Sequence, residues 1–466
     1  MFTFSKKNAS LGPRTQVLFG IITFLAVGLL LTVTGCGGNN AVQNATAANT
    51  QVKIGDAPAD SVIAFELTVT SVSLTSSSGS TVSVFSGSRE IELAHLAATV
   101  EPMALSNVPA GTYTKASIGF NGAEVTYIPT TGTTPVEKHF TTSGTVDVTP
   151  ASPVTIGTGS NVLSIDVNLA QSLTFDATGN VTAVSPVFNL SSVAVAAESE
   201  QDEESGEIED AVGTVSAAPA NNSFVLSLQM SGQSATFNVD ANTSFSDGLT
   251  AFADIKQGML LRVDATTGAN GAFNAKKVEL VEASGSEAEG FITATTSPLT
   301  SFTMVNTDGA GSGMTTANVG TTFTVNVAAG TKFRVNTDKI DLSGLSFVFG
   351  AATDLVKGQN VEVESAGAAS AGAITAEKVT LSKQALSGTV SAAAITGTTG
   401  TFTLTLAADS AFAKITGVTS VTVYQQPGTE LKGISLVTNS ASVKVRGMLF
   451  WDGTNYQFVA SRITTP

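Results

Sequence analysis

The segment Leu163-Ser164-Ile165-Asp166-Val167-Asn168-Leu169 places an apolar side chain at every second position and a polar one between. Successive side chains of a β-strand point to opposite faces, so this alternation predicts a strand with one buried face. The same pattern occurs in Phe65-Glu66-Leu67-Thr68-Val69-Thr70. Gly, Asn, Ser and Thr turns separate several such segments, which predicts an antiparallel β-sandwich over residues 51–197.

The composition of the whole chain agrees with an all-β fold. Only 13% of its 466 residues are charged, against about 25% in an average protein. Val and Thr are abundant, and both favour strands because they branch at Cβ. Beyond the first 35 residues, no segment maintains an apolar helical stripe over several turns.

The N-terminal segment is predicted to be a cleaved lipoprotein signal peptide, residues 1–35. Lys6, Lys7 and Arg14 precede an apolar run from Val17 to Val33, and small residues follow at Gly35-Cys36. This arrangement resembles a bacterial lipobox, which implies cleavage between Gly35 and Cys36 and lipidation of the Cys36 sulfur. The alternative is an uncleaved membrane helix, but the run is short for a span of about 20 residues.

The predicted leader also constrains compartment and partners. It carries three positive charges and no acidic residue, so the formal charge of −15 becomes −18 after cleavage. A chain this acidic should repel nucleic acid. We therefore expect a cell-envelope protein held at the membrane by its lipid. Gly37, which follows the cysteine, favours the outer membrane if the cell has one.

Two polar segments divide the mature chain. Residues 36–50 have the small, polar composition of a flexible tether. Residues 198–210 contain eight acidic residues in thirteen, and their mutual repulsion predicts an extended linker. A cation-binding acidic patch is the alternative for this segment, but a flexible acidic run binds cations weakly without a preformed oxygen cage.

After the linker the sequence repeats itself three times. The repeats begin at Gly213-Thr214-Val215, Gly290-Phe291-Ile292 and Gly388-Thr389-Val390. Each contains five to six predicted strands and is long enough for its own core, which predicts small OB-like β-barrels over residues 211–284, 285–383 and 384–466. The third repeat lacks the glycine found before the fourth strand in the other two.

Two uncharacterised bacterial families share these landmarks. The first domain resembles the domain-of-unknown-function family 4382 over nearly all of residues 51–195. Three segments carry this resemblance together: Asp56-Ala57-Pro58, Val108-Pro109-Ala110-Gly111-Thr112-Tyr113 and residues 163–169. The repeats resemble the domain-of-unknown-function family 5666. Neither resemblance implies a catalytic residue.

The residues available for chemistry are few. His95 and His139 are the only histidines and lie in no recognisable motif, and lipidation would remove the only thiol. Two separated histidines alone cannot form a zinc site. Asp56, Asp60, Asn306 and Asp308 offer oxygen ligands in predicted loops and are calcium candidates, although turns alone explain such residues. No cofactor is otherwise expected.

The sequence therefore predicts a non-catalytic binding, adhesive or structural protein of the cell envelope. Its expected partners are the membrane, through the lipid, and an envelope glycan or protein. One alternative is an extracytoplasmic hydrolase acting on polysaccharide or peptide through unidentified carboxylates. Another is a calcium-stabilised surface protein.

Overall fold

The computed structural model describes residues 47–57, 60–96, 100–159, 161–194, 207–228, 234–267, 273–281, 285–337, 340–370 and 372–465. The predicted signal peptide, Gly35, Cys36 and most of the predicted tether lie outside these ranges. Within them, no helix has the length and apolar character needed to cross a membrane.

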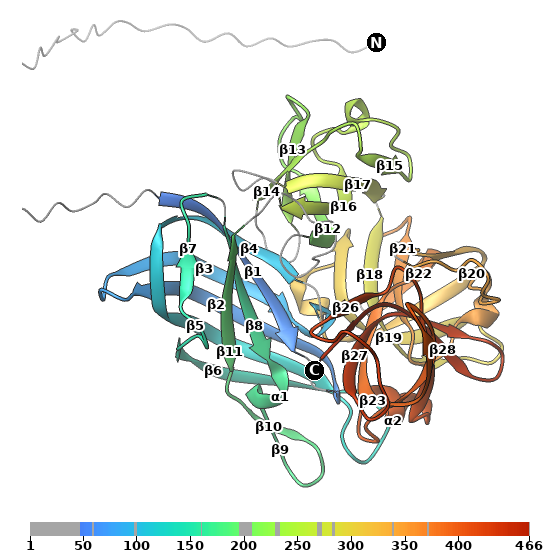
Figure 1. Ribbon diagram of the computed structural model, residues 1–466. Coiled ribbons are helices and arrows are strands. Elements are labelled where there is room, and N and C mark those ends of the chain that lie inside the picture. The colour runs from blue at the N-terminus through green and yellow to red at the C-terminus, as the bar shows by residue number, and fades with distance from the viewer. Residues whose placement is uncertain are drawn as a thin grey trace, which may run out of the picture. The chain divides into compact units, whose positions relative to one another are not determined.

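The first domain is a β-sandwich (Figure 1). One sheet has the order β11 (Phe188–Ala194), β8 (Asn161–Asn168), β1 (Ala47–Ala57), β4 (Val100–Pro109). The other has the order β3 (Thr81–Glu92), β2 (Val62–Ser76), β5 (Gly111–Tyr127), β6 (Val136–Val148), with β7 (Val154–Ile156) paired to β5. A ribbon of β9 (Leu173–Phe175) and β10 (Val181–Val184) follows helix α1 (Leu169–Ser172).

The alternating segments behave as predicted. Leu163, Ile165 and Val167 of β8 are fully buried, as are Phe65 and Leu67 of β2, and all of them join one core between the two sheets. The sandwich differs from the prediction in one pairing, because β1 and β8 run parallel. It also begins earlier: β1 starts at Ala47, so residues 47–50 belong to a strand and not to the tether.

The three repeats form three barrels. The first contains β12 (Glu207–Val215), β13 (Ser223–Leu228), β14 (Ser234–Asn238), β15 (Ser244–Ser246), β16 (Leu260–Thr267) and β17 (Phe273–Val281). The second contains β18 (Ser286–Thr295), β19 (Ser301–Gly311), β20 (Thr322–Val335), β21 (Asn360–Ser365) and β22 (Ala373–Leu381). The third contains β23 (Gln384–Thr396), β24 (Thr399–Thr405), α2 (Ala411–Thr416), β25 (Ser420–Gln425), β26 (Glu430–Lys432), β27 (Ser442–Trp451) and β28 (Tyr456–Thr464).

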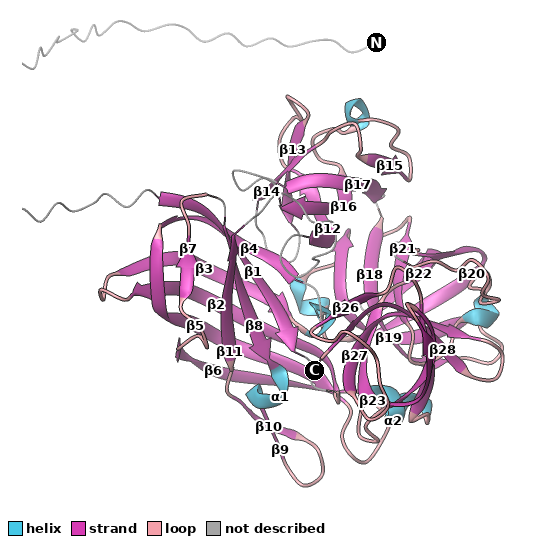
Figure 2. Cartoon of the chain, in the orientation of Figure 1, coloured by secondary structure: helices cyan, strands magenta, loops and turns pink. Residues whose placement is uncertain are grey.

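The three barrels pair their strands in the same way. With the short strands β15 and β26 set aside, the first strand of each pairs with the second and fourth, the second with the third, and the fifth with the fourth. A parallel pairing between third and fifth strands completes the ring. This order agrees with the predicted OB-type barrel. Among the described residues, helical structure is confined to short pieces (Figure 2), including 3-10 turns at Ala94–Leu96, Phe252–Asp254, Thr316–Asn318 and Ala352–Asp354.

A repeated backbone contact explains part of the sequence repeat. The apolar residue two positions after each repeat glycine exchanges hydrogen bonds with the turn before the fourth strand. The partners are Val215 with Gly258 and Met259, Ile292 with Gly358 and Gln359, and Val390 with Ser440 and Ala441. Gly258 and Gly358 have φ of 87° and 90°, and Ser440 has 69°. The third repeat therefore keeps the turn, with serine in the left-handed conformation that glycine adopts more easily.

The repeat glycines themselves allow close strand approach. A Cβ atom on Gly213, Gly290 or Gly388 would lie 2.6, 2.1 or 2.4 Å from a carbonyl oxygen of the next strand. None of the three has a left-handed φ. Glycine is therefore needed here because the first and second strands lie too close together to accommodate a Cβ atom.

We expect Gly290→Ala to destabilise the second barrel by about 1–3 kcal/mol, because the new methyl group must displace the Val305 backbone. Gly330→Ala is the matched control, because no atom lies within 4 Å of its Cβ position. Chemical denaturation of both variants checks this expectation. Equal stability of the two variants would contradict the spatial explanation.

The domains also contact one another, which the predicted string of units did not anticipate. Met448, Phe450 and Val459 of the third barrel join the core of the second. A smaller apolar cluster combines Ile63, Ala64 and Ile128 of the sandwich, Val305 of the second barrel, and Ala411 and Ile415 of the third. Burial of apolar surface therefore stabilises contacts between domains as well as the domains themselves.

Candidate functional site

A cavity of about 130 Å³ lies where the sandwich meets the second and third barrels. Its walls combine apolar and polar side chains in similar measure. The large apolar side chains are Val62, Ile63, Phe291, Leu386, Leu406 and Phe412. The polar groups come from Asp60, Thr307, Asn360, Lys383, Gln384, Ser387, Ser410 and Arg446. A cavity at a domain boundary that has both apolar walls and fixed polar groups is a candidate ligand site. The volume is below the ~300–1,000 Å³ of drug-sized pockets, so it suits one side chain or one sugar substituent.

Hydrogen bonds fix the polar groups of this cavity. The Asn360 backbone N–H donates to Gln384 Oε1 at 2.8 Å, and Gln384 Nε2 donates to the Gly358 carbonyl at 2.9 Å. Asn360 Nδ2 donates to Glu289 Oε1 at 2.6 Å. These bonds orient the two amides before any ligand enters, which lowers the entropy lost on binding.

Asp60, a calcium candidate from the sequence, lines this cavity. Its carbonyl accepts a hydrogen bond from the Ala411 N–H at the first turn of α2. Desolvation raises the pKa of the Asp60 carboxyl above its usual value, and Asp409 adds to the rise, whereas Ser387 and Lys444 oppose it. A carboxyl with a raised pKa in a cleft marks a candidate functional group.

The other calcium candidates are placed differently from the prediction. Asn306 and Asp308 lie in strand β19, not in a loop, and pair with β18. Asn306 is fully buried and its Nδ2 donates to the Asn318 carbonyl, while Asp308 Oδ1 accepts from the Gly309 N–H. Asp56 is the penultimate residue of β1, where its backbone pairs with Val167. The loop prediction for 306–308 is wrong because these residues complete the β18–β19 ladder.

The two histidines also differ in their surroundings. His139 lies on β6, with Nδ1 2.8 Å from Glu124 Oε1 and Nε2 3.1 Å from Glu137 Oε1. The hydrogen bond to Glu124 is the main cause of a raised pKa at His139. His95 lies in a 3-10 turn, and its side chain is outside the described part of the structure.

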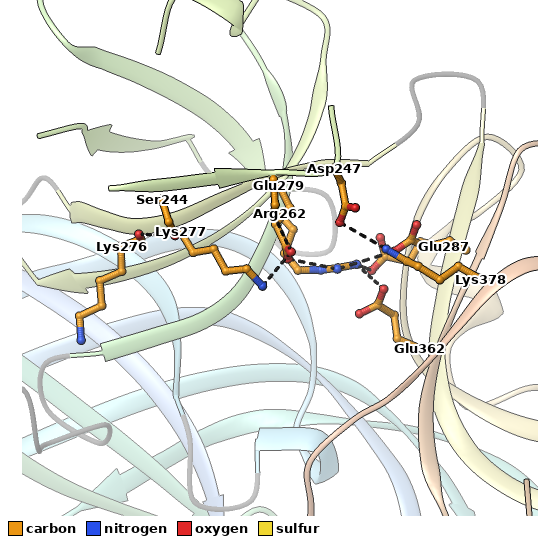
Figure 3. Close-up of polar contacts among 11 residues, drawn as sticks. Ser244, Asp247, Arg262, Lys276, Lys277, Glu279, Glu287, Glu362 and Lys378 are labelled. Atoms are coloured by element: carbon orange, nitrogen blue, oxygen red, sulfur yellow. Dashed lines mark hydrogen bonds and ion pairs between the residues drawn. The ribbon is translucent and has the colours of Figure 1, made fainter. Parts of the chain in front are cut away.

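A buried ionic cluster lies where the first and second barrels meet (Figure 3). Arg262 of β16 places Nη2 2.5 Å from Glu287 Oε1 and 2.8 Å from Glu362 Oε1. Its Nη1 is 3.6 Å from Glu279 of its own barrel. Lys378 of the second barrel adds contacts of 2.5 Å to Glu364 and 3.4 Å to Asp247 of the first barrel.

The charged side chains of this cluster are buried, so each depends on its oppositely charged partners for compensation. The Arg262 side chain is 7% exposed, and Glu287 and Glu362 are equally buried. Desolvation raises the pKa of both glutamates, although the Arg262 charge opposes the rise. Removing one partner of a buried pair leaves an uncompensated charge. The cluster therefore joins two barrels and offers no open position for a substrate.

The sequence contained a partial signal for this cluster. Arg262 interrupts the otherwise apolar segment Leu260-Leu261-Arg262-Val263, and Glu362 alternates with Val361 and Val363. Each pattern indicates a charged residue in a strand, but strand patterns cannot show which faces of two separate barrels meet.

Comparisons with known proteins identify two domains. Residues 47–183 match the family model of a domain of unknown function (DUF4382), and residues 212–279 match that of another (DUF5666). Both matches have the predicted order, which confirms the resemblance for the sandwich and for the first repeat. No curated protein matches the chain, and neither does any solved structure.

We expect Arg262→Met to lower the free energy of unfolding by about 3–5 kcal/mol at pH 8, and by less at pH 5. The variant removes the cation that contacts both Glu287 and Glu362, so their folded-state pKa values rise further above the unfolded value. Such groups lose stability as pH rises through that window. Denaturant titrations at the two pH values measure the difference.

Arg334→Met serves as the control for this variant. Arg334 is exposed, and its Nη1 donates to the neighbouring Phe333 carbonyl. Its replacement should change stability by less than about 0.5 kcal/mol. Equal losses for Arg262→Met at pH 5 and pH 8 would show that its charge does not act through these carboxyls.

Proposed function

We propose that this chain, which contains a DUF4382 domain followed by a DUF5666 domain, is a non-catalytic binding protein of the cell envelope, held at the membrane by lipid on Cys36. The observation that carries the proposal is the cavity formed jointly by the sandwich and two barrels. Its small volume and mixed apolar and polar walls favour recognition of one group on a larger envelope molecule.

The contacts between domains support a binding role. Two hydrogen bonds join the third barrel to the sandwich. The Ala411 N–H donates to the Asp60 carbonyl at 2.7 Å, and Lys414 Nζ donates to the Ile128 carbonyl at 2.9 Å. A third hydrogen bond, from Gln359 Nε2 to the Leu449 carbonyl at 3.1 Å, joins the second barrel to the third. A cavity whose walls come from three domains keeps its form only while these contacts hold, so ligand binding should also stabilise the junction.

The expected class of partner follows from the side chains that line the cavity and from the proposed cell-envelope location of the protein. Its ligand should combine a small apolar group, to contact Phe291 and Phe412, with polar atoms near Asp60 and Gln384. An acetamido substituent of an envelope glycan and a short side chain of an envelope protein both meet this description. The rival function is hydrolysis of such a polymer by carboxylates.

Binding can be tested on arrays of envelope glycans and proteins with Ala385→Leu, which narrows the cavity. We expect wild-type protein to retain a partner without turnover and Ala385→Leu to bind at least about tenfold more weakly. Ala394→Leu, at an exposed position of the same strand, is the control and should bind like wild type. Hydrolysis of a retained polymer would support the enzyme instead, and equal binding by Ala385→Leu would exclude this cavity.

The anchor can be tested by metabolic labelling with a radioactive fatty acid. We expect Cys36→Ala to abolish labelling, because no other thiol is present in the chain. Gly38→Ala, which leaves the cysteine and its predicted cleavage site intact, should remain labelled. Label retained on Cys36→Ala would contradict the lipoprotein assignment.

A further inference from the structure

Glu66 of β2 is a buried carboxyl at the contact between the sandwich and the second barrel. It lies on the face of its sheet that points away from the core, because Phe65 and Leu67 on either side of it belong to the core. Even so, Glu66 is only 3% exposed, and among the described residues its carboxyl makes no hydrogen bond and no ion pair. Without such a partner, a negative charge on Glu66 is costly.

A turn of the second barrel covers Glu66. A Cβ atom on Gly320 would lie 3.1 Å from Glu66 Oε1 and 3.2 Å from Thr126 Oγ1. The Gly320 carbonyl accepts a 2.7 Å hydrogen bond from the Thr126 hydroxyl, and the Gly320 N–H donates to the Asn306 carbonyl of its own barrel at 2.8 Å. The backbone of this turn therefore lies directly over two side chains of the sandwich, one of which is ionisable.

An apolar cluster belongs to the same contact. Ile63 and Ile128 of the sandwich pack in it together with Val305 of the second barrel. Ile63 also lines the cavity of the proposed function. Separation of Gly320 from the sandwich would therefore expose apolar surface and open one wall of that cavity.

The ionisable groups that face Glu66 are mainly carboxylates. They come from three neighbouring strands and are Glu90 and Glu92 of β3, Glu124 of β5, and Glu137 and His139 of β6. His139 contacts the carboxylates of Glu124 and Glu137. In the second barrel, residues 315–321 contain no ionisable side chain. The 3-10 turn that contacts β2 contains His95, whose side chain is outside the described part of the structure. Repulsion therefore adds to desolvation when Glu66 is ionised.

The protonation of Glu66 depends on its cover. Burial, with repulsion from Glu92 and Glu124, raises the pKa of Glu66 to about 9, so its carboxyl is neutral at pH 7. When the second barrel moves away, Glu66 regains water and the pKa of its carboxyl falls. Ionisation therefore favours the separated form. The contact is most stable at low pH, where both forms are protonated, and weakens as the pH rises through about 9.

We propose that the contact between the sandwich and the second barrel is a pH-sensitive switch, closed while Glu66 carries a proton beneath Gly320 and open once Glu66 is ionised. Its neighbour Glu92 is equally buried, but its carboxyl accepts hydrogen bonds from the Phe65 N–H at 2.7 Å and the Ala94 N–H at 2.9 Å. The fold therefore supplies donors for Glu92 and leaves Glu66 to a proton. The switch does not rest on the proposed function, because the contact can be measured without a ligand.

Pulsed electron paramagnetic resonance measures this contact as the distance between two spin labels on the full-length chain in detergent. Cys36→Ala removes the only native thiol. Gly111→Cys in the sandwich and Gly330→Cys in the second barrel then supply the label sites, because no atom lies within 4 Å of either Cβ position. We expect one narrow distance at pH 7. At pH 10 the fraction of chains at other distances should be at least about tenfold larger.

Neutral replacements of Glu66 test whether this carboxyl is the group that responds. In the labelled chain, Glu66→Gln should keep the narrow distance at both pH values. Glu66→Met, with a side chain of similar length, should do the same, so the test does not depend on the folding of one variant. Asp147→Asn is the control and should respond like the labelled chain with Glu66, because Asp147 is exposed and pairs with Lys115 at 2.7 Å. A narrow distance that persists at pH 10 with Glu66 present would overturn the proposal. An equal response of the Glu66→Gln and Glu66→Met chains would overturn it too, because another group would then be titrating.

Discussion

Charge buried at domain boundaries is the constraint on which the arrangement of this protein depends. Arg262, Glu287 and Glu362 lose water where the first two barrels meet, and Glu66 loses it where the second barrel covers the sandwich. An ionised group in such a place is costly unless an opposite charge or a hydrogen bond compensates it. In a chain with so few charged residues, these groups determine which surfaces can face each other.

The two kinds of buried charge have different consequences. Around Arg262 the opposite charges come from the protein itself, so the cluster joins barrels and favours their correct pairing over other contacts. Around Glu66 the neighbours are mainly carboxylates, and burial together with their repulsion raises the pKa of Glu66 to about 9, so a bound proton removes its charge at neutral pH. The first case concerns the contact between two barrels and the second the protonation of one side chain, although desolvation is the physical cause in both.

Much of the fold could be predicted from short-range pattern. Alternation in residues 163–169 marks a strand with one buried face, and the repeat glycines mark strands that approach closely. Pairing between strands that are distant in the sequence was harder to predict. The sequence around each strand gives no signal for the parallel β1–β8 pair or for the extension of β19 through Asp308. The repeat motif expects glycine in the turn before the fourth strand and therefore does not identify this turn in the third repeat, where Ser440 adopts the same conformation. The alternating pattern could identify Glu66 as an outward residue of a strand, but not its burial beneath Gly320 of the second barrel.

The ionic contact between the first and second barrels can be measured with a double-mutant cycle. Arg262→Met, Glu362→Gln and the double variant would be unfolded in denaturant at pH 8, giving the coupling between residues that belong to different barrels. We expect a coupling free energy of at least about 1 kcal/mol, within the range found for residues in contact. Additive effects, with coupling near zero, would show that the first two barrels do not meet through this cluster.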